Sequence, residues 1–422
     1  MRVEPFRGYR YAVGTSRDVS PVVAPPYDQI SPATQERLYA MSPENIVRVT
    51  YPRDDRPNAG APARPTANQK DKYARAREVL DGWLARGVWR REDRPAIYPY
   101  IQTYRVGGQS VTRQGFVALG EASDYTRGVV LPHERTHAGP KKDRLDLLEA
   151  TRADVGLLFM LVSDPGGELL RATAPSGEPV AEARDLQGEL HRLWRITDEA
   201  CIARVQKLME PRQAIIADGH HRYETAVAYA RRHPEATEKL MAFFTLEAPG
   251  LTIFPNHRLV HHVASFDFDD LMDAARGWFD AGPLPDPLAF RPANRVIGVV
   301  SGSDAATLTL RAERFDLVAW PPGTSRAWRE LAVSILHEGL LKPLLGITDA
   351  RLDARTHVDY TADQAEAVRL ARAGTYQAAF LIAPPTPEEL QKVVRGGELL
   401  PQKSTHFYPK LLDGLVFYRL RE

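Results

Sequence analysis

Residues 214–223 constrain the fold more than any other part of this chain. An apolar run at 214–217 stops abruptly at Asp218 and Gly219, and the residues that follow, through Arg232, favour a helix. The segment therefore predicts a strand, a tight turn and a helix N-terminus. The first N–H groups of a helix have no partner within it, and the helix dipole places positive potential there.

The residue types at this turn suit an anion such as phosphate. Gly219 allows a ligand to approach the backbone closely, and Arg222 can donate two hydrogen bonds to an anion. His220 and His221 can add donors or charge near neutral pH. We therefore predict a phosphate site here, with Arg222 facing solvent. In the alternative interpretation, Asp218 is only an N-cap and Gly219 only makes the turn.

Length and composition favour a two-domain globular protein. A chain of 422 residues is too long for one small core, and its hydrophobic content of 43% is ordinary. The formal net charge of +1 gives no bulk electrostatic case for nucleic acid or an anionic membrane as a partner. We see no signal peptide and no apolar run of membrane-spanning length. Cys201 is the only cysteine, which excludes an internal disulfide and fits a cytoplasmic location.

Hydrophobic patterns predict strands alternating with helices, which is a mixed α/β or α+β fold. A shift in composition near 247–265 separates an N-terminal region, 1–250, from a C-terminal region, 251–422. We expect strands at 96–104, 110–118, 155–162, 240–246, 295–300, 305–311, 378–383 and 414–418. We expect helices at 69–86, 186–193, 197–209, 268–279, 362–372 and from 386 onward, and a proline-rich loop at 52–68.

A second polar segment contains His133, Glu134 and His137, spaced as in the His-Glu-x-x-His pattern of zinc hydrolases. That chemistry needs both histidines on one sustained helix, and Pro132 and Pro140 leave room for only about two turns. The other functional interpretation is a loop that presents Glu134 and His133 to a substrate. The third interpretation of this segment is a polar surface loop without a function in binding or catalysis.

Further polar segments could contact an anionic or hydroxylated ligand. Lys141, Lys142 and Arg144 lie near the start of an expected helix, where cations oppose the helix dipole and a bound anion would relieve the conflict. Two prolines stiffen the turn that carries Asp28. Another loop, which the C-terminal region is expected to return to the site, carries Lys403, Ser404 and Thr405.

Five of these segments resemble one family in the expected order along the chain. They are Pro25-Pro26-Tyr27-Asp28, His133-Glu134-Arg135-Thr136, Pro140-Lys141-Lys142-Asp143-Arg144-Leu145, Asp218-Gly219-His220-His221-Arg222-Tyr223, and Pro401-Gln402-Lys403-Ser404-Thr405 through Tyr408-Pro409-Lys410. The chain resembles the bacterial and archaeal family called domain of unknown function 1015, whose name carries no activity.

The turn also resembles a second group. Gly219-His220-His221-Arg222 is similar to the phosphate-binding turn of the ParB/sulfiredoxin superfamily, in which free-serine kinases carry a similar Asp-Gly-His-His-Arg. This resemblance implies a ParB/sulfiredoxin-like phosphate-binding core, elaborated here by a second α/β region. It also implies that the turn holds the donor phosphates, that Asp218 lies near a magnesium ion, and that Glu134 acts on the acceptor hydroxyl.

The leading expectation is a phosphotransferase that uses a nucleotide or pyrophosphate donor, Mg²⁺ and a small hydroxylated acceptor, with free serine as the first candidate. The alternatives are a nucleotide-binding regulator of ParB type and a zinc hydrolase using His133, Glu134 and His137. The oligomeric state stays open. We expect Asp28, Glu134, His220, Arg222 and Lys403 to line one cleft. Expected roles are catalytic for Glu134, His220 and Arg222, phosphate-binding for Gly219, His220, His221, Arg222, Lys403, Ser404 and Thr405, substrate-binding for Asp28, His133, Lys141 and Arg144, and metal-binding for Asp218.

Overall fold

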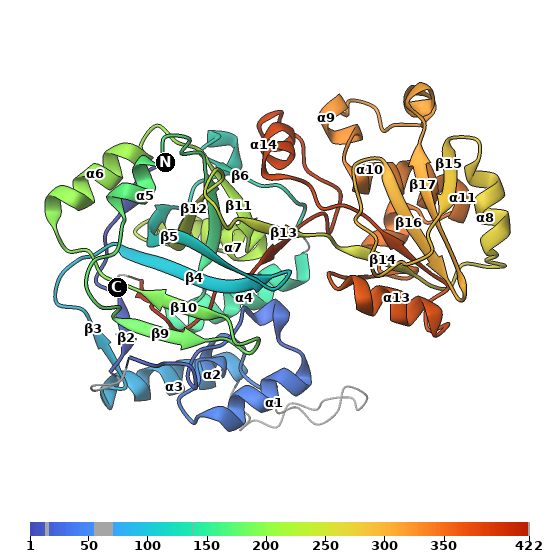
Figure 1. Cartoon of the computed structure of the whole chain (residues 1–422). Coiled ribbons are helices and arrows are strands. Elements are labelled where there is room, and N and C mark those ends of the chain that lie inside the picture. Colours follow the sequence, from blue (N-terminus) through green and yellow to red (C-terminus); the bar gives the residue numbers. More distant parts are fainter. Residues whose placement is uncertain (13–16, 55–70, 137, 421–422) are drawn as a thin grey trace. The chain divides into compact units, whose positions relative to one another are not determined.

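The computed structural model describes residues 1–12, 17–54, 71–136 and 138–420, and the chain forms two compact units. The first unit comprises Met1–Pro132, Thr136–Leu251 and Pro409–Glu422, and the second comprises His133–Arg135 and Thr252–Tyr408. Each unit combines sheets with helices, so the mixed α/β fold class is confirmed (Figure 1). The division differs from the expected regions 1–250 and 251–422 because the end of the chain returns to the first unit. A ParB/sulfiredoxin-like core stays a prediction.

A large mixed sheet forms the centre of the first unit. Its strand order is β6 (Val130–Leu131), β11 (Ala214–Asp218), β8 (Leu158–Val162), β12 (Glu238–Thr245), β5 (Gln109–Glu121), β4 (Tyr98–Val106), β10 (Leu190–Leu193) and β9 (Ala181–Arg184), with β1 (Val3–Glu4) also paired to β5. β12 is parallel to β8 and antiparallel to β5, while β11 is antiparallel to β8. Two small antiparallel pairs join β2 (Tyr9–Tyr11) to β3 (Trp89–Arg91) and β7 (Ala153–Asp154) to β21 (Tyr418–Arg419).

Helices surround this sheet. They are α1 (Pro32–Met41), α2 (Val47–Thr50), α3 (Lys72–Ala85), α4 (Ala138–Thr151), α5 (Glu168–Ala172), α6 (Glu199–Met209) and α7 (His220–Arg232), with short 3₁₀ turns η1 (Tyr27–Gln29) and η2 (Tyr125–Arg127). α6 and α7 pack on the sheet, and one core cluster includes Val205 from α6, Tyr223 from α7 and Met160 from β8. α4 packs against both α7 and α3. Burial of these apolar faces is the main force that fixes α7 beside β11.

A smaller sheet forms the centre of the second unit. Its order is β15 (Phe279–Pro283), β17 (Asp304–Leu310), β16 (Val296–Ser301), β19 (Ala378–Leu381), β14 (His257–Val260) and β18 (Val358–Thr361), and β13 (Thr252–Phe254) pairs separately with β20 (His406–Tyr408). Its helical elements are α8 (Phe268–Ala275), η3 (Ala312–Leu317), α9 (Arg326–Arg329), α10 (Ala332–Leu336), η4 (His337–Leu341), α11 (Lys342–Leu345), α12 (Asp349–Asp353), α13 (Gln364–Arg372) and α14 (Pro387–Arg395). α13 buries Ala367, Val368 and Ala371 against Leu259, Val300 and Leu381 of the sheet.

Two sequence predictions of secondary structure are wrong. Residues 186–193 were expected to be helical, but β10 occupies 190–193, because cross-strand pairing with β4 and β9 overrides a weak local preference. A strand was expected at 414–418, but Gly414 adopts φ +99°, which breaks the extended conformation there. Most of the expected loop at 52–68 lies outside the described residues.

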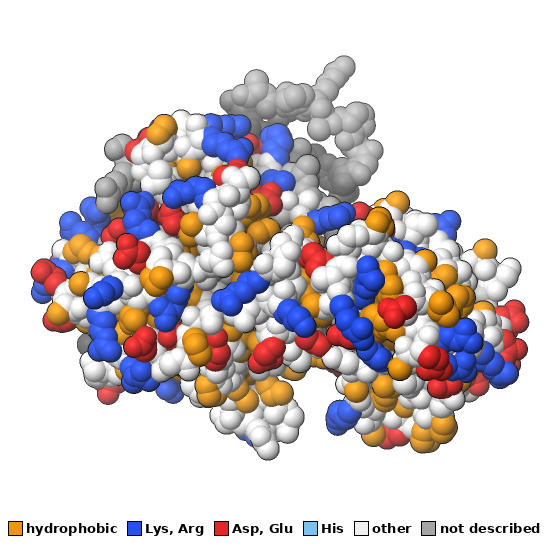
Figure 2. Space-filling view, turned by 90° about the horizontal axis from the view of Figure 1, so that it is seen from above, with side chains coloured by type: hydrophobic (Ala, Val, Ile, Leu, Met, Phe, Trp, Pro, Cys, Tyr) orange, Lys and Arg blue, Asp and Glu red, His pale blue; other side chains and the backbone are white. Residues whose placement is uncertain are grey.

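Surface charge in the described regions is mixed. On the face shown in Figure 2, basic and acidic side chains are interspersed, in keeping with the formal net charge of +1. No helix within the described residues is both long and apolar enough to cross a membrane.

Candidate functional site

The strand–turn–helix predicted at 214–223 is confirmed. β11 ends at Asp218, Gly219 adopts φ +100°, and α7 begins at His220. A Cβ atom on Gly219 would lie 2.7 Å from Cδ2 of Leu158, so both the backbone conformation and the close packing require glycine. No side chain caps the N-terminus of α7. The N-cap residue, Gly219, therefore supplies no side-chain oxygen to the first turn.

Asp218 is held between two cations. Its Oδ2 accepts a hydrogen bond from Nη2 of Arg222 at 2.8 Å, and its Oδ1 lies 3.0 Å from Nζ of Lys410. Burial raises the pKa of Asp218, but the attraction of Lys410 and Arg222 outweighs burial and holds this pKa well below its ordinary range. Asp218 is therefore a carboxylate at neutral pH, and both of its oxygens are already engaged.

Arg222 is buried, and the expectation that it faces solvent is wrong. Its side chain is 9% exposed, and its guanidinium donates to Asp218 and to the backbone carbonyl of Leu157. Burial lowers the pKa of Arg222, but the surrounding carboxylates, Asp218 foremost, outweigh this effect and raise it. The reason is geometric: in the first turn of α7 the side chain extends back over Asp218 and Gly219, where packing covers it. Arg222 therefore joins the helix to the sheet.

A second carboxylate, Asp413, is buried close to Arg222. Its Oδ1 has no hydrogen-bond partner among the described residues, and the side chain lines a small cavity of about 60 Å³ that Arg222 also lines. Burial raises the pKa of Asp413 to about 7, against the attraction of Arg222, Lys239 and Arg144. The cavity has room for a few water molecules at most, and no metabolite fits it.

Lys239 completes this buried cluster. Its Nζ forms an ion pair with Asp154 and donates to the carbonyl of Gly156 at 2.8 Å. Lys239, Asp154 and Asp413 were not recognised from the sequence. The sequence signal for such residues is a single charged residue within or beside an apolar run, as in Leu411-Leu412-Asp413-Gly414-Leu415. Since buried charges occur almost only with partners, this pattern indicates a buried ion pair.

Two expected substrate-binding residues, Asp28 and Arg144, lie in the same unit as this cluster. Asp28 is exposed on η1, and its charge contributes to the raised pKa of Arg222. The guanidinium of Arg144 lies 4.1 Å from the ring centre of Tyr27, next to Asp28, and donates to the carbonyl of Thr50 at 2.6 Å. The first unit thus brings together Asp28, Arg144, Asp218 and Arg222.

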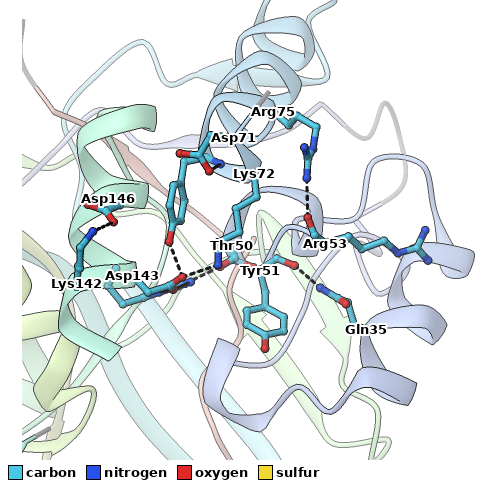
Figure 3. A network of polar contacts seen from close by, with 12 residues as sticks. Gln35, Thr50, Tyr51, Arg53, Asp71, Lys72, Arg75, Lys142, Asp143 and Asp146 are labelled. Atoms are coloured by element: carbon cyan, nitrogen blue, oxygen red, sulfur yellow. Dashed lines mark hydrogen bonds and ion pairs between the residues drawn. The ribbon is translucent and has the colours of Figure 1, made fainter. Parts of the chain in front are cut away.

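Arg144 belongs to a polar network that ties α4 to α3 and α2. Figure 3 shows Lys72 and Asp143 pointing toward each other, and Nζ of Lys72 lies 2.6 Å from the carboxylate. Tyr73 and Arg144 also donate to Asp143. Burial raises the pKa of Asp143, but Arg144, Lys72 and Tyr73 outweigh it and lower this pKa to about 2. The network gives Arg144 a structural task; its contact with substrate stays a prediction.

Lys141 faces a different partner. Its Nζ lies 2.8 Å from Oε2 of Glu224 on α7 and 3.1 Å from Oγ1 of Thr136. α4 begins at Ala138, so Pro140 is in its first turn, where a missing N–H costs little. The helix therefore includes Gly139, although a residue before proline was expected to disfavour helix.

Five expected site residues belong to the second unit, and they are His133, Glu134, Lys403, Ser404 and Thr405. His133 is 1% exposed, and its Nε2 lies 2.9 Å from Oγ1 of Thr405. The carbonyl of His133 accepts from the N–H of Leu400 at 2.8 Å. Asn256 donates to the carbonyl of Thr405 at 3.1 Å. The two loops around His133 and Thr405, which are far apart in sequence, therefore pack together.

Glu134 and Lys403 belong to the same two loops. Glu134 lies close enough to the buried Arg258 to influence its pKa, which burial lowers to about 10, and Arg258 donates to the carbonyl of Gln402 at 3.1 Å. Lys403 adopts φ +55°, an uncommon conformation for a residue other than glycine, and Ser404 donates to the carbonyl of Pro401. Because Glu134 and Lys403 belong to the second unit, their convergence with Arg222 stays a prediction.

The Mg²⁺ ion expected near Asp218 stays a prediction, and so does the expected absence of zinc at His133 and His137. The described residues contain no group of three or more His, Cys, Asp or Glu side chains placed to hold a metal ion. His133 and Glu134 lie in a bend before α4 begins, and His137 lies outside the described residues. Asp218 has both oxygens engaged by Arg222 and Lys410, so as arranged it does not fit a resident Mg²⁺ ion.

Comparison with known families identifies the chain. The model of the family described as "Protein of unknown function (DUF1015)" matches residues 3–334. The chain belongs to the DUF1015 family. The match to the DUF1015 family includes the segment around Asp28 and the turn at Asp218. The loop at Lys403 lies beyond the matched residues.

Solved structures show weak similarity to this DUF1015 protein. A conserved hypothetical protein from Pyrococcus furiosus is 11% identical, with a TM-score of 0.35, over 70% of this chain and 93% of that one. A free serine kinase in complex with AMP is 11% identical, with a TM-score of 0.36, over 69% and 86%. SbnI with a C-terminal truncation, from Staphylococcus aureus, is 10% identical, with a TM-score of 0.37, over 70% and 85%. No curated protein matches the sequence.

Proposed function

We propose that this DUF1015 protein binds the phosphates of a nucleotide or pyrophosphate at the N-terminus of α7 and transfers a phosphoryl group to a small hydroxylated metabolite, with free serine as the first candidate. The observation that carries the proposal is a helix of 13 residues that begins directly after Gly219 without a side-chain cap. The N-terminus of a helix carries positive potential and directs its N–H groups outward, which favours an anion.

The residues after Gly219 strengthen this argument. His220 and His221 occupy the first turn of α7, where a protonated imidazole opposes the helix dipole unless an anion lies nearby. Asp218 attracts His220, but its charge is shared with Arg222 and Lys410. A phosphate would give the first turn the negative charge that its sequence lacks.

In this proposal Arg222 and Lys410 act mainly by fixing the turn, and the N–H groups of α7 bind the phosphate. The acceptor hydroxyl oxygen forms a bond to the transferred phosphorus as the bond from phosphorus to the leaving phosphate breaks. The hydroxyl proton goes to a carboxylate, and the motif resemblance assigns this role to Glu134. Mg²⁺ would enter with the donor as the counterion of its phosphates.

Calorimetric titration of the full chain with ATP, ADP and pyrophosphate, each with Mg²⁺, tests binding. His221→Ala should weaken the affinity for the bound donor by about threefold to tenfold, through loss of a donor or charge at the helix terminus. The matched control is His233→Ala, because His233 caps the opposite end of α7 and should leave this affinity unchanged. If the wild type binds none of the three donors, the proposal fails.

Turnover is tested separately, by following phosphate transfer from the donor that binds to free serine and to other small alcohols. Glu134→Gln should abolish transfer while it leaves donor binding intact. Tight donor binding with no transfer to any acceptor would instead favour the nucleotide-binding regulator.

A further inference from the structure

The second unit contains a cavity that the proposed phosphate site does not use. Its volume is about 400 Å³, within the range of small-molecule sites. All of its lining residues belong to the second unit. Apolar side chains, among them Trp328, Leu352 and Leu400, form part of the wall.

The cavity borders one π-helical turn, η4, which lies between α10 and α11. The backbone N–H of Lys342 donates to the carbonyl of His337, five residues back. Pro343 follows directly and has no N–H, so it cannot form the regular bond to the carbonyl of Gly339, and the helix widens there. Single π turns of this kind occur frequently at functional sites.

His337 is one of two residues of the widened turn that line the cavity, and Glu338 is the other. His337 is 3% exposed, and its Nε2 has no hydrogen-bond partner among the described residues. Burial, with added repulsion from Arg258 and Lys342, holds the pKa of His337 well below its ordinary value, so the imidazole is neutral. A buried polar nitrogen without a partner is costly, and a ligand in the cavity would supply one.

The charged groups of the cavity are mainly acidic. The lining contains four carboxylates and two cations. The carboxylates are Glu338, Asp349, Asp353 and Glu398, and the cations are Arg135 and Lys342. Lys342 pairs with two of the four carboxylates, since its Nζ lies 2.7 Å from Glu338 and 2.9 Å from Asp349, but its single positive charge offsets only one of them. The remaining charge favours a cationic ligand.

From the cavity, the unpartnered His337 nitrogen and the excess of carboxylates, we infer that the second unit binds a small organic cation, a primary ammonium group on a short hydrocarbon body. The ammonium group donates to the neutral imidazole of His337 and is attracted by Asp353. The hydrocarbon body packs on Trp328 and Leu400. The inference does not depend on the phosphate site, since no residue of that site in the first unit takes part.

Ligand-observed NMR titration of the full chain with three probes of similar size tests the inference. The probes are n-butylamine, 1-butanol and butyrate, which share a hydrocarbon body and differ in charge. We expect saturable binding of n-butylamine alone. Asp353→Asn should weaken it by about threefold, and His337→Gln by about tenfold. The matched control is Asp316→Asn, an exposed acid on η3 of the same unit, which should have no effect.

Several results would overturn the inference. These are absence of n-butylamine binding, equal binding of the three probes, and full affinity in Asp353→Asn. If His337→Gln prevents folding, the exposed Asp353 still decides the outcome, since its replacement leaves the core intact.

Discussion

Lys410 lies 192 residues after Asp218 in the chain, yet its Nζ is 3.0 Å from Oδ1 of that carboxylate. The pair is mostly shielded, with each side chain 18% exposed. The C-terminal segment therefore supplies half of the charge that holds the end of β11 in place.

Lys410→Met should destabilise the first unit by on the order of 1–3 kcal/mol at pH 7, because Asp218 loses one of two cationic partners. The pKa of Asp218 is lowered in the folded state, so its contribution is present above the unfolded pKa of about 4 and is lost as pH falls further. Urea unfolding at pH 7 and at pH 3 should show that the stability difference between the variant and the wild type is smaller at pH 3. Lys207→Met, at an exposed position on α6, is the control and should change stability little.

Asp413 should make the stability of the protein depend on pH in the opposite direction to Asp218. Its folded pKa of about 7 is above the unfolded value, so between about pH 4 and 7 the folded state binds more protons and stability falls as pH rises. The loss should be on the order of 2–4 kcal/mol over that window. Asp413→Asn should remove this dependence and be more stable than the wild type at pH 8. Parallel stability curves for the two proteins between pH 5 and pH 8 would contradict the raised pKa of Asp413.

Arg222→Ala should destabilise the protein by roughly 3–5 kcal/mol, because it leaves Asp218 without one partner and the Leu157 carbonyl without its donor. Arg222→Lys should restore only part of this, since lysine lacks the forked guanidinium. The matched control on the same helix is Arg231→Ala, whose exposed pair with Asp124 contributes little. Equal unfolding midpoints for Arg222→Ala and Arg231→Ala would show that Arg222 is not structural.

Gly219→Ala and Gly82→Ala should shift stability in opposite directions. At Gly219 the positive φ and the contact with Leu158 make a methyl group costly, on the order of 1–3 kcal/mol. At Gly82, within α3, the new Cβ would meet its nearest atom, Nη1 of Arg86, at an ordinary 3.7 Å. The substitution there should stabilise by about 0.5–1 kcal/mol, because glycine is unfavourable in a helix. Thermal unfolding of both variants checks the sign.

Local patterns allowed much of the fold to be predicted. The strands expected at 96–104 and 110–118 are β4 and β5, joined by a hairpin at Gly107-Gly108. The helix expected from 386 onward is α14, which begins with a capping box of Thr386 and Glu389. Both features depend only on neighbouring residues. The helix wrongly assigned at 186–193 lies where pairing with distant strands decides the conformation. The strand wrongly assigned at 414–418 is interrupted by the positive φ of Gly414.

The candidate site was predictable only in part, for the same reason. The residue types at Asp218, Gly219 and His220 predict a turn followed by the start of a helix. Nothing in the sequence near Arg222 indicates that Leu157 and Asp413 will enclose it, since those neighbours come from distant segments. Burial of a charged side chain is a property of the assembled unit.

The chain leaves the first unit after Leu251 and re-enters it at Pro409, and all of the second unit except His133–Arg135 lies between as an insertion. Its two ends are adjacent, because Thr252 pairs with Tyr408 in the β13–β20 ladder. A stop codon after residue 251 would therefore yield an incomplete fragment that lacks Lys410 and Asp413, with Asp218 half neutralised. Deletion of residues 252–408, with residues 251 and 409 joined by a short linker, would instead keep Lys410 and Asp413 in the same chain as Asp218.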